Sequence, residues 1–393
     1  MKILKIDAYD GMSFFGGLVF FAPAALLVRT QAGISESRFF LLQVLLSAII
    51  ALGELPTGYL TDRIGYRSSL ILSQLLLLAA RAALMAAYLL RSFPLFILEA
   101  VAEGVSACLS SGTGSAYLYS LYGERDYLPK TAHAANCGTA GFLISTVSYA
   151  VIYQYFSLEG LLLSSALSGA AGVLCAMLLR REPCGGKLKI HDEKPQLSQL
   201  LVLLRDRRAR RFTVLLSVFS VAWLLVNFFY VEILKQCGIP ITWLSAIIIA
   251  YSAAQMLAEP IIKLCRNCSK GKLIIFYCML CCAVLLGLGL LRSTLALIML
   301  MVFLPLLLDL ALFCVEEQQN QLIDVLELDN NRAAALSVMN IGVNLMEVLS
   351  LFVSSLLVAA GINWCFGLCG VFLLICVMPC RRRVKEQTVQ DGS

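Results

Sequence analysis

Charge is scarce in this chain. Only 14% of its 393 residues are charged, whereas 60% are hydrophobic. A soluble domain of this length needs a far more polar surface, because its outside must be covered by groups that water solvates. The scarcity excludes an ordinary soluble protein, and we expect the chain to use lipid as its solvent.

Residues that carry metal or nucleophilic chemistry are also few. The chain has two histidines, His133 and His191, and no HExxH motif. Its CxxC pair, Cys265 and Cys268, lacks the second pair that a structural zinc site needs. The sequence contains no Walker motif and no nucleophile–base constellation, which argues against an ATP-driven pump and against an enzyme. We expect no metal and no cofactor.

Most of the sequence consists of long apolar runs. A bilayer core needs about 20 apolar residues per helical span, and the chain has six such runs on each side of one long polar break. We expect an all-α membrane protein with twelve transmembrane helices in two six-helix bundles, 1–180 and 211–393, joined by a cytoplasmic linker, 181–210. The expected spans are 11–30, 38–60, 70–90, 94–121, 132–155, 158–180, 211–234, 240–263, 272–291, 295–317, 332–360 and 363–380.

The expected linker has its own pattern. Leu197, Leu200, Leu201 and Leu204 recur at helical spacing before a basic run, which predicts an amphipathic helix on the inner leaflet. A plain tether that also enforces the topology, and a regulatory or partner-binding segment, are both compatible with this pattern.

Basic residues indicate the orientation. If the N-terminus lies inside, 25 of the 31 Lys and Arg residues fall in inside segments. Five fall outside (Arg29, Arg38, Arg91, Lys235 and Arg292), and Arg81 falls within a span. Loops that stay in the cytoplasm carry an excess of Lys and Arg, so we expect a protein of the cell inner membrane with both termini cytoplasmic. The net charge of +6 reflects this orientation, and we expect no nucleic-acid partner.

The turn between the second and third runs concentrates glycine and charge. Gly58 and Gly65 bracket a short segment in which backbones can approach closely. Asp62 lies near the start of a helix, where the positive end of a helix dipole, its own or a neighbour's, favours a carboxylate. Arg63 and Arg67 can pair with Asp62 or with carboxylates of the other half. Such a cluster is a candidate latch that is intact in one access state and broken in the other.

This turn resembles the loop between helices two and three of the major facilitator superfamily. The run Gly58-x-x-x-Asp62-Arg63-x-Gly65-x-Arg67 matches that signature, and Glu54-x-Pro56-x-Gly58 is a common bacterial variant. The segment 331–337 is similar to the start of helix eleven in many bacterial members. The resemblance implies two pseudo-symmetric six-helix halves and a conformational latch. The latch residues are Glu54, Gly58, Asp62, Arg63, Gly65, Arg67 and Arg332.

Three departures from the family pattern bear on the direction and coupling of transport. Asn267 stands where the second-half loop would have Asp. The fifth run lacks the Gly-Pro ending typical of antiporters, and Ser120 stands where related exporters often have Asp. These departures weaken the case for proton antiport and drug export without touching the resemblance to the superfamily.

Ionisable residues at membrane depth are costly, so each is a candidate site. Arg81 in the third run and Glu103 in the fourth are equidistant from the turn near Ser92, which predicts an ion pair between them. Either that pair is structural, or Glu103 takes up a proton as Arg81 changes partner. The candidate coupling residues are Arg81, Glu99, Glu103, Asp309 and Glu347.

The resemblance also implies that runs one, four, seven and ten line a central cavity. Asn227, Tyr230 and Glu232 on the seventh run are therefore candidate substrate contacts, with Glu103 and Asp309 as further wall residues. We expect a monomeric secondary active transporter of a small molecule, coupled to protons and surrounded by lipid, with export of an amphiphilic or drug-like solute favoured. The alternatives are uptake or facilitated diffusion of a small polar metabolite, and a non-transporting membrane sensor or scaffold.

Overall fold

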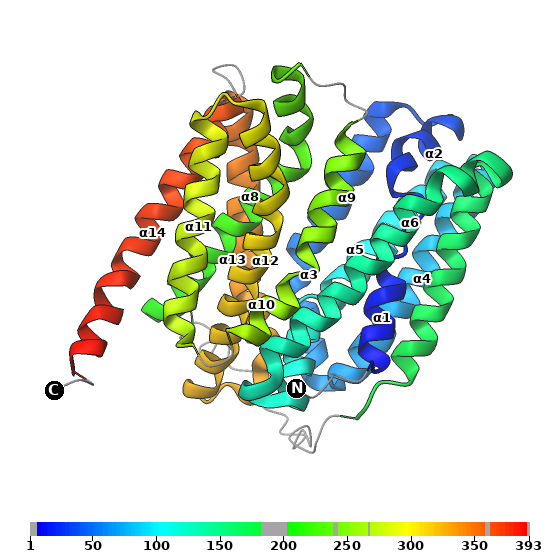
Figure 1. Cartoon of the computed structure of the whole chain (residues 1–393). Coiled ribbons are helices and arrows are strands. Elements are labelled where there is room, and N and C mark those ends of the chain that lie inside the picture. Colours follow the sequence, from blue (N-terminus) through cyan, green and yellow to red (C-terminus); the bar gives the residue numbers. More distant parts are fainter. Residues whose placement is uncertain are drawn as a thin grey trace. The chain divides into compact units, whose positions relative to one another are not determined.

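The structure is a computed structural model that describes residues 6–181, 203, 205–238, 243–265, 268–357 and 362–390. Within these residues every regular element is a helix (Figure 1). The chain divides into two compact units, Met1–Leu200 with Ile323–Val338, and Leu201–Leu322 with Met339–Ser393. The segment Ile323–Val338 comes from the C-terminal half of the sequence but belongs to the first unit.

In the described part of its N-terminal segment, the first unit has six α-helices and one short turn of 3-10 helix. Asp7 begins the first helix through a capping box, in which its carboxylate accepts from the N–H of Tyr9 and Asp10 and the Asp10 carboxylate accepts from the N–H of Asp7. Such reciprocal bonds satisfy N–H groups that have no partner inside the helix. The helices are α1 (Ala8–Gly17), η1 (Ala22–Ala24), α2 (Ala25–Gln31), α3 (Glu36–Ile64), α4 (Tyr66–Leu90), α5 (Phe93–Ser110) and α6 (Thr113–Met177).

The long helix α6 reverses direction twice. Gly123 and Ser157 have positive φ angles of 61° and 55° inside it, so the ribbon turns there and α6 supplies three helical segments, 113–122, 124–156 and 158–177. Figure 1 shows α1 lying along α6, and α4 packs on both α5 and α6. The helices of the first unit thus fall on the six runs expected from the sequence.

Two expected continuous spans are interrupted. The run 11–30 breaks after α1, which ends at Gly17, and resumes as η1 and α2; Pro23 lies at the start of η1, where a missing N–H is tolerated. The run 94–121 breaks at Gly112, where φ is 66°. Both interruptions lie beside residues of the candidate site described below.

After α6 the chain continues with the helices α8 (Arg207–Gln236), α9 (Trp243–Gln255), α10 (Ala258–Leu264), α11 (Lys270–Leu290), α12 (Thr294–Val325), η2 (Asp329–Asn331), α13 (Arg332–Leu357) and α14 (Ile362–Gln390), most of which belong to the second unit. The end of α12, η2 and the first turns of α13 belong to the first unit. Within the second unit α14 packs against α11 and α8. The expected amphipathic linker helix lies almost wholly outside the described residues.

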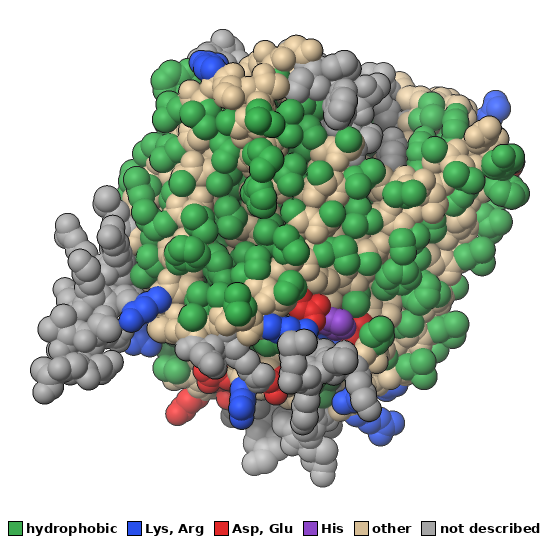
Figure 2. All heavy atoms as spheres, viewed as in Figure 1, with side chains coloured by type: hydrophobic (Ala, Val, Ile, Leu, Met, Phe, Trp, Pro, Cys, Tyr) green, Lys and Arg blue, Asp and Glu red, His purple; other side chains and the backbone are tan. Residues whose placement is uncertain are grey.

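Seven of the described helices are long and apolar enough to cross a membrane by length and composition. This number is below twelve partly because α5 and α6 together form a single stretch, Phe93–Met177, and because the described apolar part of α14, Asn363–Val377, is shorter than a span. Large apolar side chains also face outward along the helices, among them Leu167, Leu174 and Ile375, each more than 60% exposed. In Figure 2 apolar side chains cover the middle of the visible helices and charged ones gather near helix ends. This distribution suits contact with lipid.

Candidate functional site

The Asp62 carboxylate lies at the N-terminus of α13, inside the first unit. Its Oδ1 accepts a hydrogen bond from the Ala333 N–H at 2.9 Å, and its Oδ2 accepts one from the Ala334 N–H at 2.7 Å. The first N–H groups of a helix lack partners inside the helix, and the dipole makes that end positive. Asp62 is buried, so the two bonds hold an anion and tie the end of α3 to the start of α13.

Gly58 faces the same helix end one turn earlier on α3. A Cβ atom at this position would lie 2.9 Å from the Ser337 Cβ and 3.0 Å from the Ala333 carbonyl oxygen, closer than packed side chains approach. Glu54, a further turn back, is buried beside the hydroxyls of Ser111 and Ser337. The missing side chain at 58 is therefore what allows α13 to reach α3.

Gly65 and the two arginines of the turn have separate roles. Gly65 joins α3 to α4 with a φ of 89°, which residues with a Cβ rarely adopt. The Arg67 Nε donates to the Leu179 carbonyl at 2.8 Å, and its Nη2 donates to the Met177 carbonyl at 2.7 Å. These carbonyls lie at the end of α6, where a helix dipole favours a cation. Arg63 is exposed.

Arg332 stabilises the turn that precedes α13. Its guanidinium pairs with Asp324 and, at 2.6 Å, with Asp329. It also lies 4.7 Å from the ring centre of Tyr119 on α6, and the Tyr119 hydroxyl donates to Asp324 at 2.6 Å.

A cavity of about 210 Å³ inside the first unit brings together the charged residues of α4 and α5. Arg81, Glu99 and Glu103 all line it. The rest of its wall is Gly16, Val19, Phe21, Leu77, Ala80 and Leu84. The cavity is therefore amphiphilic, with an arginine and two carboxyl groups set among apolar side chains.

Glu99 and Glu103 lie one turn apart on α5 and both line this cavity. Glu99 also forms an ion pair with Arg29, whose Nη2 lies 2.7 Å from the Glu99 Oε1. Arg29 is stacked against the rings of Phe39 and Phe96, at 5.7 and 5.8 Å.

The position of Arg29 corrects the sequence analysis, which assigned it to an outside loop. The residue lies on α2 and is 4% exposed, because α2 turns back onto the apolar core of the first unit after the break in the first span. A lone arginine just beyond a proline-interrupted apolar run is the sequence signal that could have identified it.

The predicted Arg81–Glu103 ion pair is not formed among the described residues. The Arg81 Nη1 donates to the Ser165 carbonyl at 2.9 Å and to the Ser168 Oγ at 2.7 Å, and its Nη2 donates to the Gly16 carbonyl at 3.3 Å. Glu103 lines the same cavity and acts on Arg81 at longer range. α6 and α1 supply closer acceptors for the Arg81 guanidinium than α5 does.

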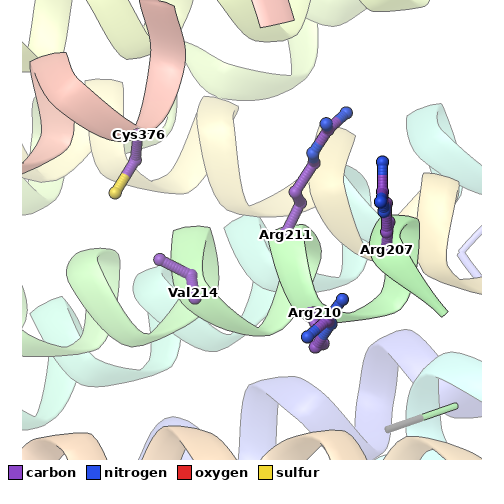
Figure 3. Close-up of a pocket in the computed structure, with 5 residues that line it drawn as sticks. All are labelled: Arg207, Arg210, Arg211, Val214 and Cys376. Atoms are coloured by element: carbon purple, nitrogen blue, oxygen red, sulfur yellow. The ribbon is translucent and has the colours of Figure 1, made fainter. Parts of the chain in front are cut away.

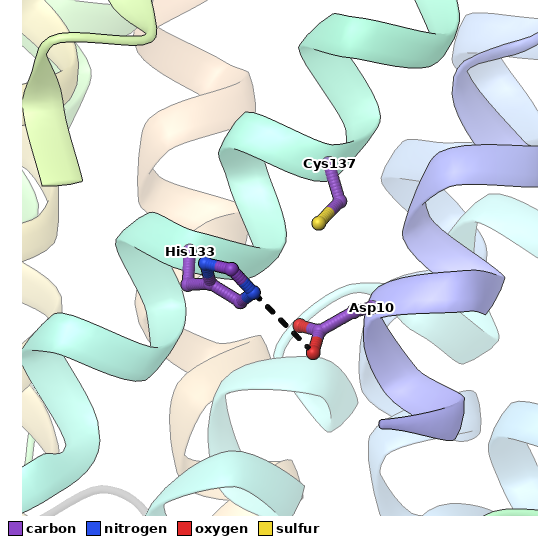
Figure 4. A group of neighbouring side chains, drawn as sticks. All are labelled: Asp10, His133 and Cys137. Carbon is purple, nitrogen blue, oxygen red and sulfur yellow. Dashed lines mark ion pairs between the residues drawn. The ribbon is translucent and has the colours of Figure 1, made fainter. Parts of the chain in front are cut away.

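Lys130 forms a second buried charge cluster, which the sequence analysis missed. Its ammonium lies 2.6 Å from the Asp10 carboxylate and 3.0 Å from Asp7, and the side chains of Lys130 and Asp10 are fully buried. Figure 4 shows His133 and Cys137 of α6 turned toward Asp10 on α1. The three possible ligand atoms lie within 4.8 Å of one another. The Lys130 ammonium pairs with the Asp10 carboxylate, so the cluster joins α1 to α6.

Asp7 shows the electrostatic effect of this cluster. Burial by itself raises the pKa of the Asp7 carboxyl, but hydrogen bonds from Tyr122 and Lys130 outweigh it and leave the pKa below its usual range. The sequence analysis had counted Lys130 among cytoplasmic loop charges. An acidic pair at the start of one apolar run and a single lysine at the start of another is the pattern that could have revealed the cluster.

In the second unit the candidate residues are dispersed. The Asp309 Oδ2 on α12 accepts a hydrogen bond from the Gln255 Nε2 on α9 at 2.6 Å. Tyr230 is 2% exposed, and its hydroxyl donates to the Met301 carbonyl at 2.8 Å, so it packs within the helices of this unit. Its ring lies against Tyr251 and Phe366. The side chains of three other candidates lie outside the described residues: Asn227, Glu232 and Glu347.

Comparisons with known proteins agree with this architecture. The sequence model described as Major Facilitator Superfamily matches residues 11–316. A variant of the E. coli fucose:proton symporter FucP has a similar structure, with 14% identity, a TM-score of 0.76, and coverage of 96% of this chain and 97% of that one. The proton:xylose symporter XylE aligns with 15% identity and a TM-score of 0.70 over 94% and 93% of the two chains.

A human relative is also similar in structure. The human organic anion transporter MFSD10 aligns with 14% identity and a TM-score of 0.68 over 95% of this chain and 97% of that one. A search of functionally curated proteins found no match in sequence. The predicted all-helical membrane fold and the predicted family are confirmed. The chain belongs to the major facilitator superfamily, whose members are membrane transporters and not enzymes.

Proposed function

We propose that this chain is a secondary active transporter that moves a small molecule across the membrane by alternating access and couples that movement to protons. The observation that carries the proposal is the shared cavity of Arg81, Glu99 and Glu103 in the first unit. Ionisable groups at membrane depth are energetically costly, and for that reason they tend to mark functional sites. This cavity gathers three of them beside apolar walls.

The proton site is the Glu99–Glu103 pair. Arg29 fixes Glu99 as an ion-pair partner, so Glu103 is the member of the pair that exchanges the proton. Arg81 is held by neutral oxygens of α1 and α6. Loss of the proton leaves a second carboxylate beside the cavity, which attracts the Arg81 guanidinium away from those oxygens. Protonation thereby changes the contacts between α4, α5 and α6.

The conformational latch is the Asp62 contact with the start of α13. Its hydrogen bonds form between a buried carboxylate and a helix end, and such a contact is either made or broken rather than gradually stretched. We assign the intact latch to the outward-open state, since it closes helix ends on the side of the loop between α3 and α4. Glu54, Gly58, Gly65, Arg67 and Arg332 support the contact.

The orientation follows from the distribution of Lys and Arg, which places both termini in the cytoplasm of a cell whose inner membrane holds the protein. The sequence halves 1–180 and 211–393 then act as the two moving bundles, with 181–210 as the cytoplasmic linker. We propose that the transporter works as a monomer. Its solute is amphiphilic, because the cavity joins charged groups to Phe21, Leu77 and Leu84, and export is the direction to test first.

Reconstitution tests the proposal. Purified protein is first screened for ligands by thermal shift, and the ligands found are then followed into proteoliposomes with and without a pH gradient, while a trapped pH dye reports proton movement. We expect flux that the gradient accelerates and that carries protons with it. Flux that ignores the gradient identifies a facilitator, and no flux with any ligand identifies a sensor or scaffold; either result contradicts the proposal.

A further inference from the structure

A basic groove lies within the second unit, between α8 and α14. It has a volume of about 490 Å³ and is lined by Arg207, Arg210 and Arg211 of α8, together with Val214 and Cys376. Figure 3 shows Arg207 and Arg211 extending side by side from α8, and Cys376 on α14 reaching toward α8. Three arginines of one helix thus border a hollow that the apolar Val214 and Cys376 also line.

Within the part of the chain that the structure describes, the positive charge of this groove has no acidic partner. Among the residues that the structure describes, no carboxylate pairs with Arg207, Arg210 or Arg211. The nearest acid in the sequence, Asp206, instead begins α8, where its Oδ1 accepts from the Arg208 N–H at 2.6 Å and the Ala209 N–H at 2.9 Å. Like charges held this close repel one another, so an anion in the groove would relieve that repulsion.

The side-chain geometry of the arginines favours a phosphate group as the bound anion. A guanidinium presents a planar fork of N–H donors that matches two oxygens of a phosphate, whereas an ammonium acts as a point charge. Arg207 and Arg211 are four residues apart and therefore lie on the same face of the helix. Two forks on one face can hold one phosphate group from two directions.

The position of the groove at the start of a membrane span favours a lipid phosphate over a free ion. The candidate membrane span Arg207–Val226 begins at the groove itself, so the arginines lie where headgroups meet the hydrocarbon region. The adjoining face of α14 exposes Phe372 and Ile375, which offers apolar surface to an acyl chain. Basic grooves between helices at this depth suit anionic headgroups.

We propose that this groove binds the phosphate of an anionic phospholipid, with Arg207 and Arg211 on the phosphate and Arg210 at its side. Val214 and Cys376 contact the first carbons below the headgroup. In the orientation proposed above, the lipid belongs to the cytoplasmic leaflet. The inference does not depend on which solute is transported, because the groove is lined by residues of the second unit alone.

Native mass spectrometry of the full-length protein in detergent tests the inference. Delipidated protein is titrated with dioleoylphosphatidylglycerol or, as a neutral comparison, dioleoylphosphatidylcholine. The double variant R207Q/R211Q is compared with R125Q/R208Q, which loses the same two charges at exposed positions that do not line the groove. Each basic residue contributes about 1 kcal/mol to binding of an anionic lipid, so the groove variant should lose roughly 30-fold in affinity, while the control stays near the parent.

Three results would overturn the inference. Equal losses in both double variants mean that net charge, and not the groove, attracts the lipid. Equal binding of the two lipids means that the headgroup charge is not recognised. Displacement of the lipid by excess inorganic phosphate means that the groove takes a free anion. Circular dichroism and the melting temperature in detergent establish that each variant is folded before its affinity is compared.

Discussion

Buried cations of the first unit are stabilised in three different ways. Lys130 has two carboxylates within 3.0 Å. Arg29 has one carboxylate and two aromatic rings. Arg81 has three neutral oxygens and only a longer-range interaction with Glu103. The charge of Lys130 is neutralised by its carboxylate partners, whereas Arg81 carries a charge that can change partner. Substitutions at these two residues should therefore have different consequences.

Lys130→Met is expected to reduce stability without altering the cavity. The variant leaves the buried Asp10 and the partly buried Asp7 without their cation, and breaking a buried ion pair on one side costs about 3–5 kcal/mol. The melting temperature in detergent should fall clearly, and adding Asp10→Asn should restore most of the loss. Arg125→Met, at an exposed position, serves as the control. A Lys130→Met protein as stable as the parent would show that the cluster does not join α1 to α6.

Glu103→Gln is expected to abolish proton coupling while solute binding persists. The amide keeps the size and the hydrogen bond of the protonated acid but cannot release a proton. Gradient-driven flux in proteoliposomes should fall to the level without a gradient, and the thermal shift caused by the solute should remain. Glu159→Gln, at an exposed position on α6, is the matched control. Retained gradient-driven transport would exclude Glu103 as the proton carrier.

At the scale of elements, the start of α13 is held from several sides. The end of α3 approaches it through Gly58 and Asp62, while Arg332 fixes the preceding turn. Leu336, on the same first turns of α13, is 4% exposed and packs on Gly112. Exposure of Leu336 therefore reports whether this contact is closed or open.

Asp62→Asn is expected to weaken the outward-open state. The neutral amide loses a charge-assisted interaction with the N–H groups of α13, worth about 1.5–3 kcal/mol per hydrogen bond. A cysteine at 336, in a background without reactive cysteines, should react faster with a thiol reagent in the variant. Asp126→Asn, the same change at an exposed position, should leave the rate unchanged. Equal rates in parent and Asp62→Asn would rule out the latch.

Gly58→Ala is expected to act in the same direction for a steric reason. The added methyl group would meet Ser337 and the Ala333 carbonyl within 3.0 Å, so α13 must move away from α3. Labelling at 336 should again increase. Gly16→Ala is the comparison, since a Cβ at 16 meets no atom within 4 Å. Unchanged labelling in Gly58→Ala would mean that the helix ends can adjust without opening.

At the scale of the whole molecule, the excess of Lys and Arg in the inside loops has to be counted again without Arg29 and Lys130. Arg29 and Lys130 are buried within the first unit, although the sequence analysis had counted one outside and one inside. Removing one residue from each side leaves the excess of inside Lys and Arg almost unchanged. The proposed orientation therefore stands on the loop residues alone, as the physical basis of the rule requires.

Impermeant thiol labelling in intact cells can test that orientation. Cysteines introduced at 91 and 157, both exposed, lie in turns that we assign to the outside and should be labelled directly. Cysteines at 124 and 181, also exposed, should be labelled only after the membrane is opened. The reverse pattern would place both termini outside and move the proposed lipid groove to the other leaflet.

The sequence by itself determined the medium, the helices and the family. Those conclusions rest on local properties, since apolar runs, turn glycines and the Gly58–Arg67 motif are readable without knowing what packs against what. It also indicated that Asp62 needs the positive end of a helix, and that Arg81 and Glu103 share a depth.

Only the tertiary structure decided which partners these charges take. Asp62 binds α13, which begins about 270 residues later in the chain, and Arg81 binds α6 and α1 instead of Glu103. The Lys130 cluster and the Arg29–Glu99 pair likewise join distant segments. A buried charge is satisfied by whichever oxygen or nitrogen folding brings nearest. That distance depends on helix breaks and packing that no local pattern records.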